Sequence, residues 1–123
     1  MSKRILIVDD IGFIVEFEST VIDALSKEIK QKILIDSANS VREALAKIAQ
    51  NDYDAMVVDM NLPDGTGIEI AKAAQAKNAQ TRIAALTIYP QKFEQDHTYF
   101  DAYFKKPILP AVYKENVRRL LQL

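Results

Sequence analysis

Five short apolar runs divide this chain of 123 residues, and stretches with a helical period separate them. The runs cover residues 5–8, 33–35, 55–58, 83–86 and 102–104. Within each run, apolar residues follow one another without alternating with polar ones, which is typical of strands that are covered on both faces of a parallel sheet. A chain that alternates five such strands with helices has few folds open to it.

Apolar residues between the runs recur at the spacing of amphipathic helices. In the second helix, with Ser40 as its predicted N-cap, the stripe comprises Val41, Ala44, Leu45, Ile48 and Ala49. The stripe of the first helix comprises Ile14, Phe17, Val21 and Leu25. The stripe of the last helix comprises Leu109, Tyr113, Val117, Leu120 and Leu121. Residues 67–77 predict a third helix, whereas residues 90–98 predict only a short one.

Parallel strands need crossover connections, and these are right-handed, so that helices cover both faces of the sheet. The chain is therefore predicted to be an α/β protein with a flavodoxin-like, doubly wound sheet of five parallel strands in the order 2-1-3-4-5 and five helices. Five units are too few for an eightfold barrel. Residues 1–123 are expected to form one domain, with no output domain in this chain.

Composition excludes several classes of function. The chain has 16 Lys and Arg against 17 Asp and Glu, a net charge of −1, so we expect no direct nucleic-acid binding. It has no cysteine, which excludes disulfides and thiol chemistry. Its single histidine, His97, is predicted to lie at the surface, because it has no companion ligands for a metal site. No apolar run approaches the roughly 18 residues of a membrane span, and none resembles a signal peptide. A cytoplasmic location is expected.

Acidic residues stand where two neighbouring strands should end. Asp9 and Asp10 follow the first run, and Asp59 ends the third. Ligands of open parallel sheets bind at this edge, so we expect the three carboxylates to meet and at least one pKa to be raised unless a cation neutralises them. Oxygen ligands without histidine or cysteine favour Mg²⁺.

Two further polar residues end the later strands, Thr87 after the fourth run and Lys106 after the fifth. A hydroxyl, an ammonium and Mg²⁺ around one carboxylate are suited to bind a phosphoryl group, and an aspartate can itself accept one. Taken singly, the aspartates are ordinary turn or capping residues, Thr87 a capping or strand residue, and Lys106 a surface lysine. Only their joint pattern indicates phosphoryl chemistry.

These motifs resemble those of the response-regulator receiver domain of two-component signalling, of the chemotaxis-regulator type. The matching segments are residues 5–10, 57–67, 86–87 and 103–107. The resemblance covers the whole chain and implies a phosphorylation-dependent signalling switch. It implies no enzyme in the usual sense, but a phosphoacceptor that assists its own phosphorylation and slow dephosphorylation.

The resemblance also implies the roles of the site residues. Asp59 would accept a phosphoryl group from a histidine kinase or a histidine phosphotransfer protein. Mg²⁺ would be bound by Asp10, by Asp59 and by the backbone carbonyl of Asn61, with Asp9 reaching it through water. Lys106 would pair with the phosphoryl oxygens.

The implied switch involves Thr87 and Tyr103. Thr87 would hydrogen-bond a phosphoryl oxygen and move toward it, and Tyr103 would turn inward. The face formed by the fourth helix, the fifth strand and the fifth helix would then repack, and a downstream protein target or an output domain of the same protein would recognise it. A cis peptide bond before Pro107 is also implied.

The chain departs from the family's pattern at several positions. Ile11 stands where an acidic residue is common, which removes a charge near the cation. Ile88 stands where a small residue is usual, which narrows access to the phosphoacceptor. The aromatic residues of the output face, which either fill the core or form a docking surface, are Tyr89, Phe93, Tyr99, Phe100 and Tyr103.

Two other functions remain open at this point. One is a phosphorylation-independent protein-interaction module on the same fold, which only Ile11, Ile88 and the aromatic output face favour, because all five core site positions are present. The other is a Mg²⁺-dependent hydrolase of small phosphate esters. It would need a dedicated acid or base, but no histidine or glutamate stands at the strand ends, and the Asp-x-Asp spacing of aspartyl-phosphate phosphatases is replaced by Asp59-Met60-Asn61.

Overall fold

A computed structural model describes residues 2–88 and 99–123 of the chain. Five parallel strands form one sheet in the order β2-β1-β3-β4-β5. They are β1 (Lys3–Val8), β2 (Ile33–Ala38), β3 (Ala55–Asp59), β4 (Arg82–Thr87) and β5 (Ala102–Lys105). The predicted flavodoxin-like strand order is confirmed.

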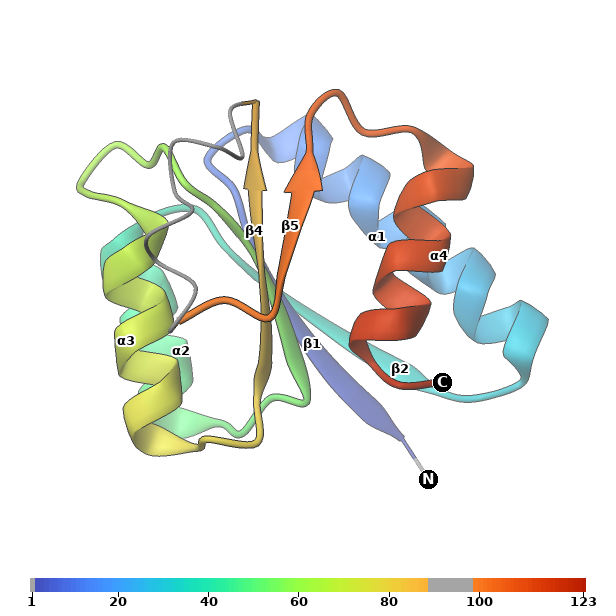
Figure 1. Cartoon of the computed structure of the whole chain (residues 1–123), viewed down its shortest axis with the longest axis horizontal. Coiled ribbons are helices and arrows are strands. Elements are labelled where there is room, and N and C mark those ends of the chain that lie inside the picture. Colours follow the sequence, from blue (N-terminus) through green and yellow to red (C-terminus); the bar gives the residue numbers. More distant parts are fainter. Residues whose placement is uncertain (1, 89–98) are drawn as a thin grey trace.

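Helices cover both faces of this sheet (Figure 1). They are α1 (Gly12–Ile29), α2 (Val41–Gln50), α3 (Gly67–Lys77) and α4 (Pro110–Leu120). Helices α2 and α3 lie on one face, and α1 and α4 on the other (Figure 1). Helix α4 is the fifth helix expected from the sequence. The short helix predicted for residues 90–98, with Phe93 and His97 in it, and the neighbouring Tyr89 lie outside the described residues.

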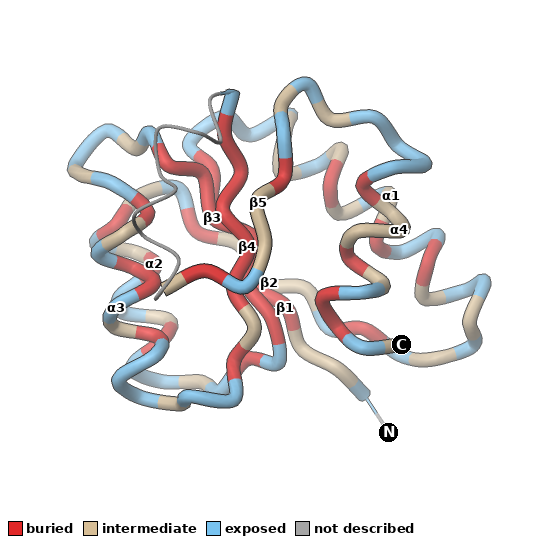
Figure 2. The backbone as a smooth tube through the Cα atoms, in the orientation of Figure 1, coloured by how far each residue is buried: buried red, intermediate tan, exposed pale blue. Residues whose placement is uncertain are grey.

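The core consists of two hydrophobic layers, one on each side of the sheet. Successive side chains of a strand point to opposite faces, so Leu6 and Val8 pack toward α2 and α3, whereas Ile5 and Ile7 pack toward α1 and α4. The central strands are buried along their length (Figure 2). Burial on both faces is why the strands read as continuous apolar runs. No helix in the described part of the chain combines the length and the apolarity needed to cross a bilayer.

The backbone at the start of α2 donates hydrogen bonds to side chains from two loops, the one after β2 and the one after β3. The hydroxyl of Ser40, the predicted N-cap, accepts a hydrogen bond from the backbone N–H of Glu43 at 3.1 Å. The Asp64 carboxylate, in the loop after β3, accepts from the backbone N–H groups of Val41 and Arg42 at 2.8 and 3.0 Å. The loop after β3 is therefore held against α2 at the edge of the sheet where the strands end.

The predicted buried face of α1 was partly wrong. Its fully buried residues are Glu18, Ile22 and Leu25, whereas Ile14, Phe17 and Val21 are only half-buried. The face that contacts the sheet is rotated from the predicted stripe and includes Glu18, a charged residue. On the other helices the predicted stripes include three exposed residues, which are Leu45, Ala49 and Leu109.

Candidate functional site

Three carboxylates meet at the edge of the sheet where β1 and β3 end. One oxygen each from Asp9, Asp10 and Asp59 lies within 4.8 Å of the others. The parallel register sets Val8 opposite Val58, so the residues that follow them come out side by side. Asp9 and Asp59 are buried and Asp10 is exposed. The three acids expected to converge are thus brought together as an acid cluster.

Asp9 is the member of the acid cluster that has a raised pKa and an unpaired carboxylate oxygen among the described residues. Its side chain is buried, and one carboxylate oxygen accepts a hydrogen bond from the backbone N–H of Ile11 at 2.9 Å. The other oxygen is buried with no hydrogen-bond partner among the described residues. Burial raises the pKa of Asp9; the Ile11 hydrogen bond and Lys106 lower it, and the Asp59 charge raises it further. The raised pKa agrees with the expectation that at least one of the three carboxyls has a raised pKa, although burial contributes more to it than repulsion does.

Asp59 is held in place by two donors. The Lys106 Nζ lies 3.3 Å from the Oδ1 of Asp59, and the backbone N–H of Asn61 donates to the same oxygen at 3.1 Å. The backbone N–H of Lys106 donates to the carbonyl of Thr87 at 2.9 Å, so the lysine is tied to the end of β4. The peptide bond from Lys106 to Pro107 is cis, as the family resemblance implied.

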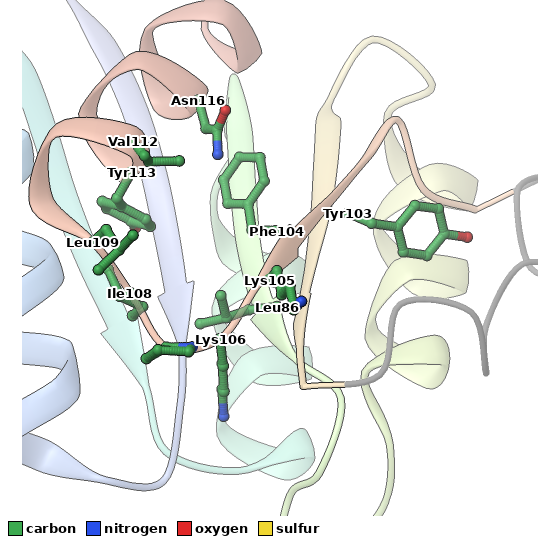
Figure 3. Close-up of a pocket in the computed structure, with 11 residues that line it drawn as sticks. Leu86, Tyr103, Phe104, Lys105, Lys106, Ile108, Leu109, Val112, Tyr113 and Asn116 are labelled. Atoms are coloured by element: carbon green, nitrogen blue, oxygen red, sulfur yellow. The ribbon is translucent and has the colours of Figure 1, made fainter.

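Thr87 and Tyr103 lie on the adjacent strands β4 and β5. Thr87 is buried at the end of β4, and Tyr103 is half-buried opposite Ala85 in the parallel register. The Tyr103 side chain points away from α4 (Figure 3) and lies 5.8 Å, between ring centroids, from Phe100. Phe100 is buried in the layer beneath α2 and α3, so this ring fills the core.

A pocket of about 440 Å³ lies beside the acid cluster, between β5 and α4 (Figure 3). The apolar residues that line it include Leu86, Phe104, Val112 and Tyr113, and Lys106 lines it as well. No aspartate lines the pocket. Lys106 therefore connects two neighbouring features, since it pairs with Asp59 and also borders the pocket.

Comparison with known proteins identifies the fold family. A family model described as the response regulator receiver domain matches residues 5–118. The chain belongs to this receiver-domain family. The chemotaxis response regulator CheY4 of Vibrio cholerae is 26% identical, with a TM-score of 0.84, and the match covers 98% of this chain and 99% of CheY4.

Other relatives extend the comparison. The response regulator TrrA of Thermotoga maritima, solved in complex with Mg²⁺-BeF, is 32% identical with a TM-score of 0.77, over 96% of this chain and 98% of TrrA. The transcriptional regulatory protein PhoP of Bacillus subtilis is 27% identical over 99% of this receiver domain and 50% of PhoP. The receiver domain spans half or less of the length of the first curated relatives it matches.

Receiver domains bind Mg²⁺ at an acidic pocket, and the acid cluster of this receiver domain fits that ion. Its donors are carboxylate oxygens, which a hard cation prefers. One buried Asp9 oxygen, which has no hydrogen-bond partner among the described residues, offers a further acceptor for a positive group. Chemistry and burial therefore agree with the Mg²⁺ expected from the sequence.

Sequence reasoning missed Glu18, which is fully buried in this receiver domain. Burial raises the pKa of its carboxyl to about 8. A signal was available, because Val15, Ile22, Leu25 and Ile29 follow a helical spacing that Glu18 completes. The charged residue interrupts that stripe, and the stripe predicted from the sequence does not include it.

Gly67, at the start of α3, allows the backbone of Asp59 to pack closely. A Cβ there would lie 2.8 Å from the Val58 Cγ1, 2.9 Å from the Met60 Sδ and 3.0 Å from the backbone oxygen of Asp59. We expect Gly67→Ala to lower the free energy of unfolding by about 1–3 kcal/mol through overpacking. Urea denaturation measures this, and the backbone amide resonance of Asp59 should shift.

Gly12, at the start of α1, provides the matched control. A Cβ there would meet no atom within 4 Å, so Gly12→Ala should leave the stability nearly unchanged. Equal stability of the two variants would show that the close approach at Gly67 does not constrain the backbone around Asp59.

Proposed function

We propose that this receiver domain is a phosphorylation-dependent switch in which Asp59 is the phosphoacceptor. The observation that carries the proposal is the buried Asp59 carboxylate, which lies among two other acids with the Lys106 ammonium 3.3 Å away. The donor is a phosphohistidine of a histidine kinase or a histidine phosphotransfer protein. Its phosphorus–nitrogen bond breaks, a bond forms between phosphorus and an Asp59 oxygen, and the histidine nitrogen leaves with the electron pair.

The acid cluster would also hold Mg²⁺. Its direct ligands would be Asp10, Asp59 and the backbone carbonyl of Asn61, with Asp9 acting through water. When bound, the ion supplies positive charge that offsets the carboxylates and the phosphoryl oxygens. Phosphoryl transfer depends mainly on positioning and charge neutralisation, and two donors on one oxygen already orient Asp59. The residues present thus suit self-assisted phosphorylation and slow dephosphorylation, not turnover of a substrate.

Phosphorylation would act on Thr87 and Tyr103. The phosphoryl group adds up to about two negative charges and new acceptor oxygens, to which the Thr87 hydroxyl and the Lys106 ammonium would donate. Movement of Thr87 toward the group leaves space behind β4, and Tyr103 turns into that space. The face that includes β5 and α4 then repacks, so that the group biases an equilibrium already present.

A downstream protein target or an output domain would recognise the repacked face. The curated relatives are longer than this receiver domain, which is compatible with either arrangement. We assign residues 1–123 to the receiver domain as a whole, and we expect it to act in the cytoplasm.

Intact mass spectrometry tests the proposal directly. Incubation with Mg²⁺ and acetyl phosphate should add one phosphoryl group to the wild-type protein, and removal of Mg²⁺ with a chelator should prevent the addition. Asp59→Asn should give no adduct, because an amide is not a phosphoryl acceptor. Asp23→Asn, at an exposed position of α1, is the matched control and should react like wild type.

An adduct that persists in Asp59→Asn would assign the acceptor elsewhere. Wild-type protein that never reacts would contradict the switch and would favour the phosphorylation-independent interaction module on the same fold.

A further inference from the structure

The outer side of β2 is an open edge of the sheet. Strand β2 comes first in the order β2-β1-β3-β4-β5, so β1 is its only strand partner among the described residues. A groove of about 380 Å³ runs along the other side of β2, lined by Ser19 and Asp23 of α1 and by residues 33–37. An uncovered edge with unpaired backbone groups readily accepts another strand.

The backbone of β2 shows which of its groups face outward. The N–H of Lys3 donates to the carbonyl of Lys32 at 2.9 Å, and the N–H of Asp9 donates to the carbonyl of Ala38 at 3.1 Å. Backbone groups alternate between the two sides of a strand, so the even-numbered residues of β2 face β1 in the parallel ladder. The N–H and C=O groups of the odd-numbered residues therefore face the groove.

Side chains of this domain cap both ends of the open edge. The hydroxyl of Ser26 donates to the carbonyl of Gln31 at 2.6 Å, and the ammonium of Lys47 donates to the carbonyl of Ser37. Between these two caps, the outward N–H and C=O groups of Ile33 and Ile35 make no hydrogen bond to a described residue. The free part of the edge is thus centred on Leu34.

The side chains around Leu34 form a self-complementary pattern. Leu34 is an exposed apolar residue, and Lys32 and Asp36 stand two residues before and after it, so the three share one face of the strand. In an antiparallel pair with its two-fold axis at Leu34, this residue lies opposite its own copy. Lys32 then lies opposite Asp36 of the second copy, and opposite charges stabilise a pair of strands in that position.

Asp36 is oriented to make this ion pair. The Nη2 of Arg4 lies 3.2 Å from the Oδ2 of Asp36, and the hydroxyl of Tyr53 donates to the same oxygen at 2.7 Å. Both contacts use Oδ2, so Oδ1 can accept a hydrogen bond from the ammonium of Lys32 of the second copy.

The backbone agrees with the same register. It places Ile33 opposite Ile35 of the second copy, and an antiparallel pair of outward-facing residues exchanges two hydrogen bonds. All the free outward groups of these two residues are then used. A shift by two residues in either direction places Leu34 opposite Lys32 or Asp36 and separates the two ion pairs, so one register is preferred.

We propose that β2 is a dimerisation edge, at which a second copy of this chain adds its own β2 in antiparallel orientation about a two-fold axis at Leu34. The same residues contribute from both copies, so the interface closes on itself. The sheet continues through both copies, and β5 lies at the opposite edge of each sheet. The face that includes β5 and α4 therefore stays free in the dimer. The proposal does not depend on phosphorylation of Asp59.

Sedimentation equilibrium over roughly 10 μM to 1 mM protein, the range of weak association, tests the proposal. Wild type should dimerise as its concentration rises. Leu34→Lys should lower the association constant by about tenfold or more, because two like charges then face each other at the centre of the interface. Leu34 is exposed in the single chain, so this variant should keep the wild-type thermal midpoint at low concentration. Val112→Lys, at an exposed apolar position of α4, is the matched control and should dimerise like wild type.

A mixing experiment tests the register. Leu34→Glu alone should be monomeric, and an equimolar mixture of Leu34→Glu and Leu34→Lys should form heterodimers, because residue 34 lies opposite residue 34. Native mass spectrometry resolves the two masses. In wild type, hydrogen exchange at the amides of Ile33 and Ile35 should slow as the protein concentration rises.

Three outcomes would overturn the proposal. Wild type that stays monomeric up to the highest concentration would leave the edge to a strand from a different protein. A dimer that Leu34→Lys leaves intact would place the interface on another face. A mixture of the two charged variants that stays monomeric would exclude a two-fold axis at Leu34.

Discussion

Substituting Glu18 with glutamine should remove roughly 5 kcal/mol of pH dependence from the free energy of unfolding. The pKa of Glu18 is about 8 in the folded protein, and its ordinary value is 4.5. Between these values the unfolded chain loses the proton while the folded chain keeps it. The stability contribution of Glu18 is therefore fully present below pH 4.5 and falls steadily until about pH 8.

The measurement is urea denaturation of wild type and of Glu18→Gln at intervals from pH 4.5 to pH 9. Other titrating groups contribute equally to both proteins, so the difference between the two free energies isolates Glu18. It should change in favour of Glu18→Gln as pH rises. Glu16→Gln, at an exposed position of α1, should show no such trend, and a constant difference for Glu18→Gln would mean that Glu18 is ionised in the folded state.

Lys106→Met should slow formation of the phosphoryl adduct by roughly 100- to 1000-fold, the loss typical of removing one aligned charge-stabilising donor. The Lys106 ammonium lies 3.3 Å from Asp59 and faces the position where phosphoryl charge would accumulate. Its removal also raises the pKa of Asp9 further, because the positive charge of Lys106 lowers that pKa in the wild-type protein. The rate is measured by intact mass over time with Mg²⁺ and acetyl phosphate.

Two variants sharpen this result. Lys105→Met changes the exposed neighbour and should react at the wild-type rate. Lys106→Arg keeps the charge but replaces a compact ammonium by a planar guanidinium, so we expect a rate between wild type and Lys106→Met. Equal rates for Lys106→Met and Lys105→Met would exclude a direct role for Lys106.

Burial of Glu18 shows where local pattern reasoning fails. Helical spacing through Val15, Ile22 and Leu25 indicates the correct face of α1, but a carboxylate is expensive to bury, so this spacing alone does not place Glu18 inside. Packing of α1 against the sheet and α4 overrides that preference, and burial raises the pKa of the carboxyl to about 8. Similarly, Leu109 fits the apolar period of α4 but precedes its first turn and is exposed.

Much of the acid cluster, by contrast, follows from the sequence. Continuous apolar runs require burial on both faces, and this requirement leads to a parallel sheet whose strands end at one edge. Asp9 directly follows the first apolar run, and Asp59 ends the third. Once the strand order is known, no further long-range information is needed to predict that they meet.

The sequence by itself determined the fold class, the strand order and the residues at the functional edge, because periodicity and strand ends are local properties of the chain. Only the tertiary structure decided which face of α1 is buried, how Lys106 orients Asp59, and which carboxyls have raised pKa values. Those outcomes depend on the burial and the charges that segments far apart in the chain bring to one another.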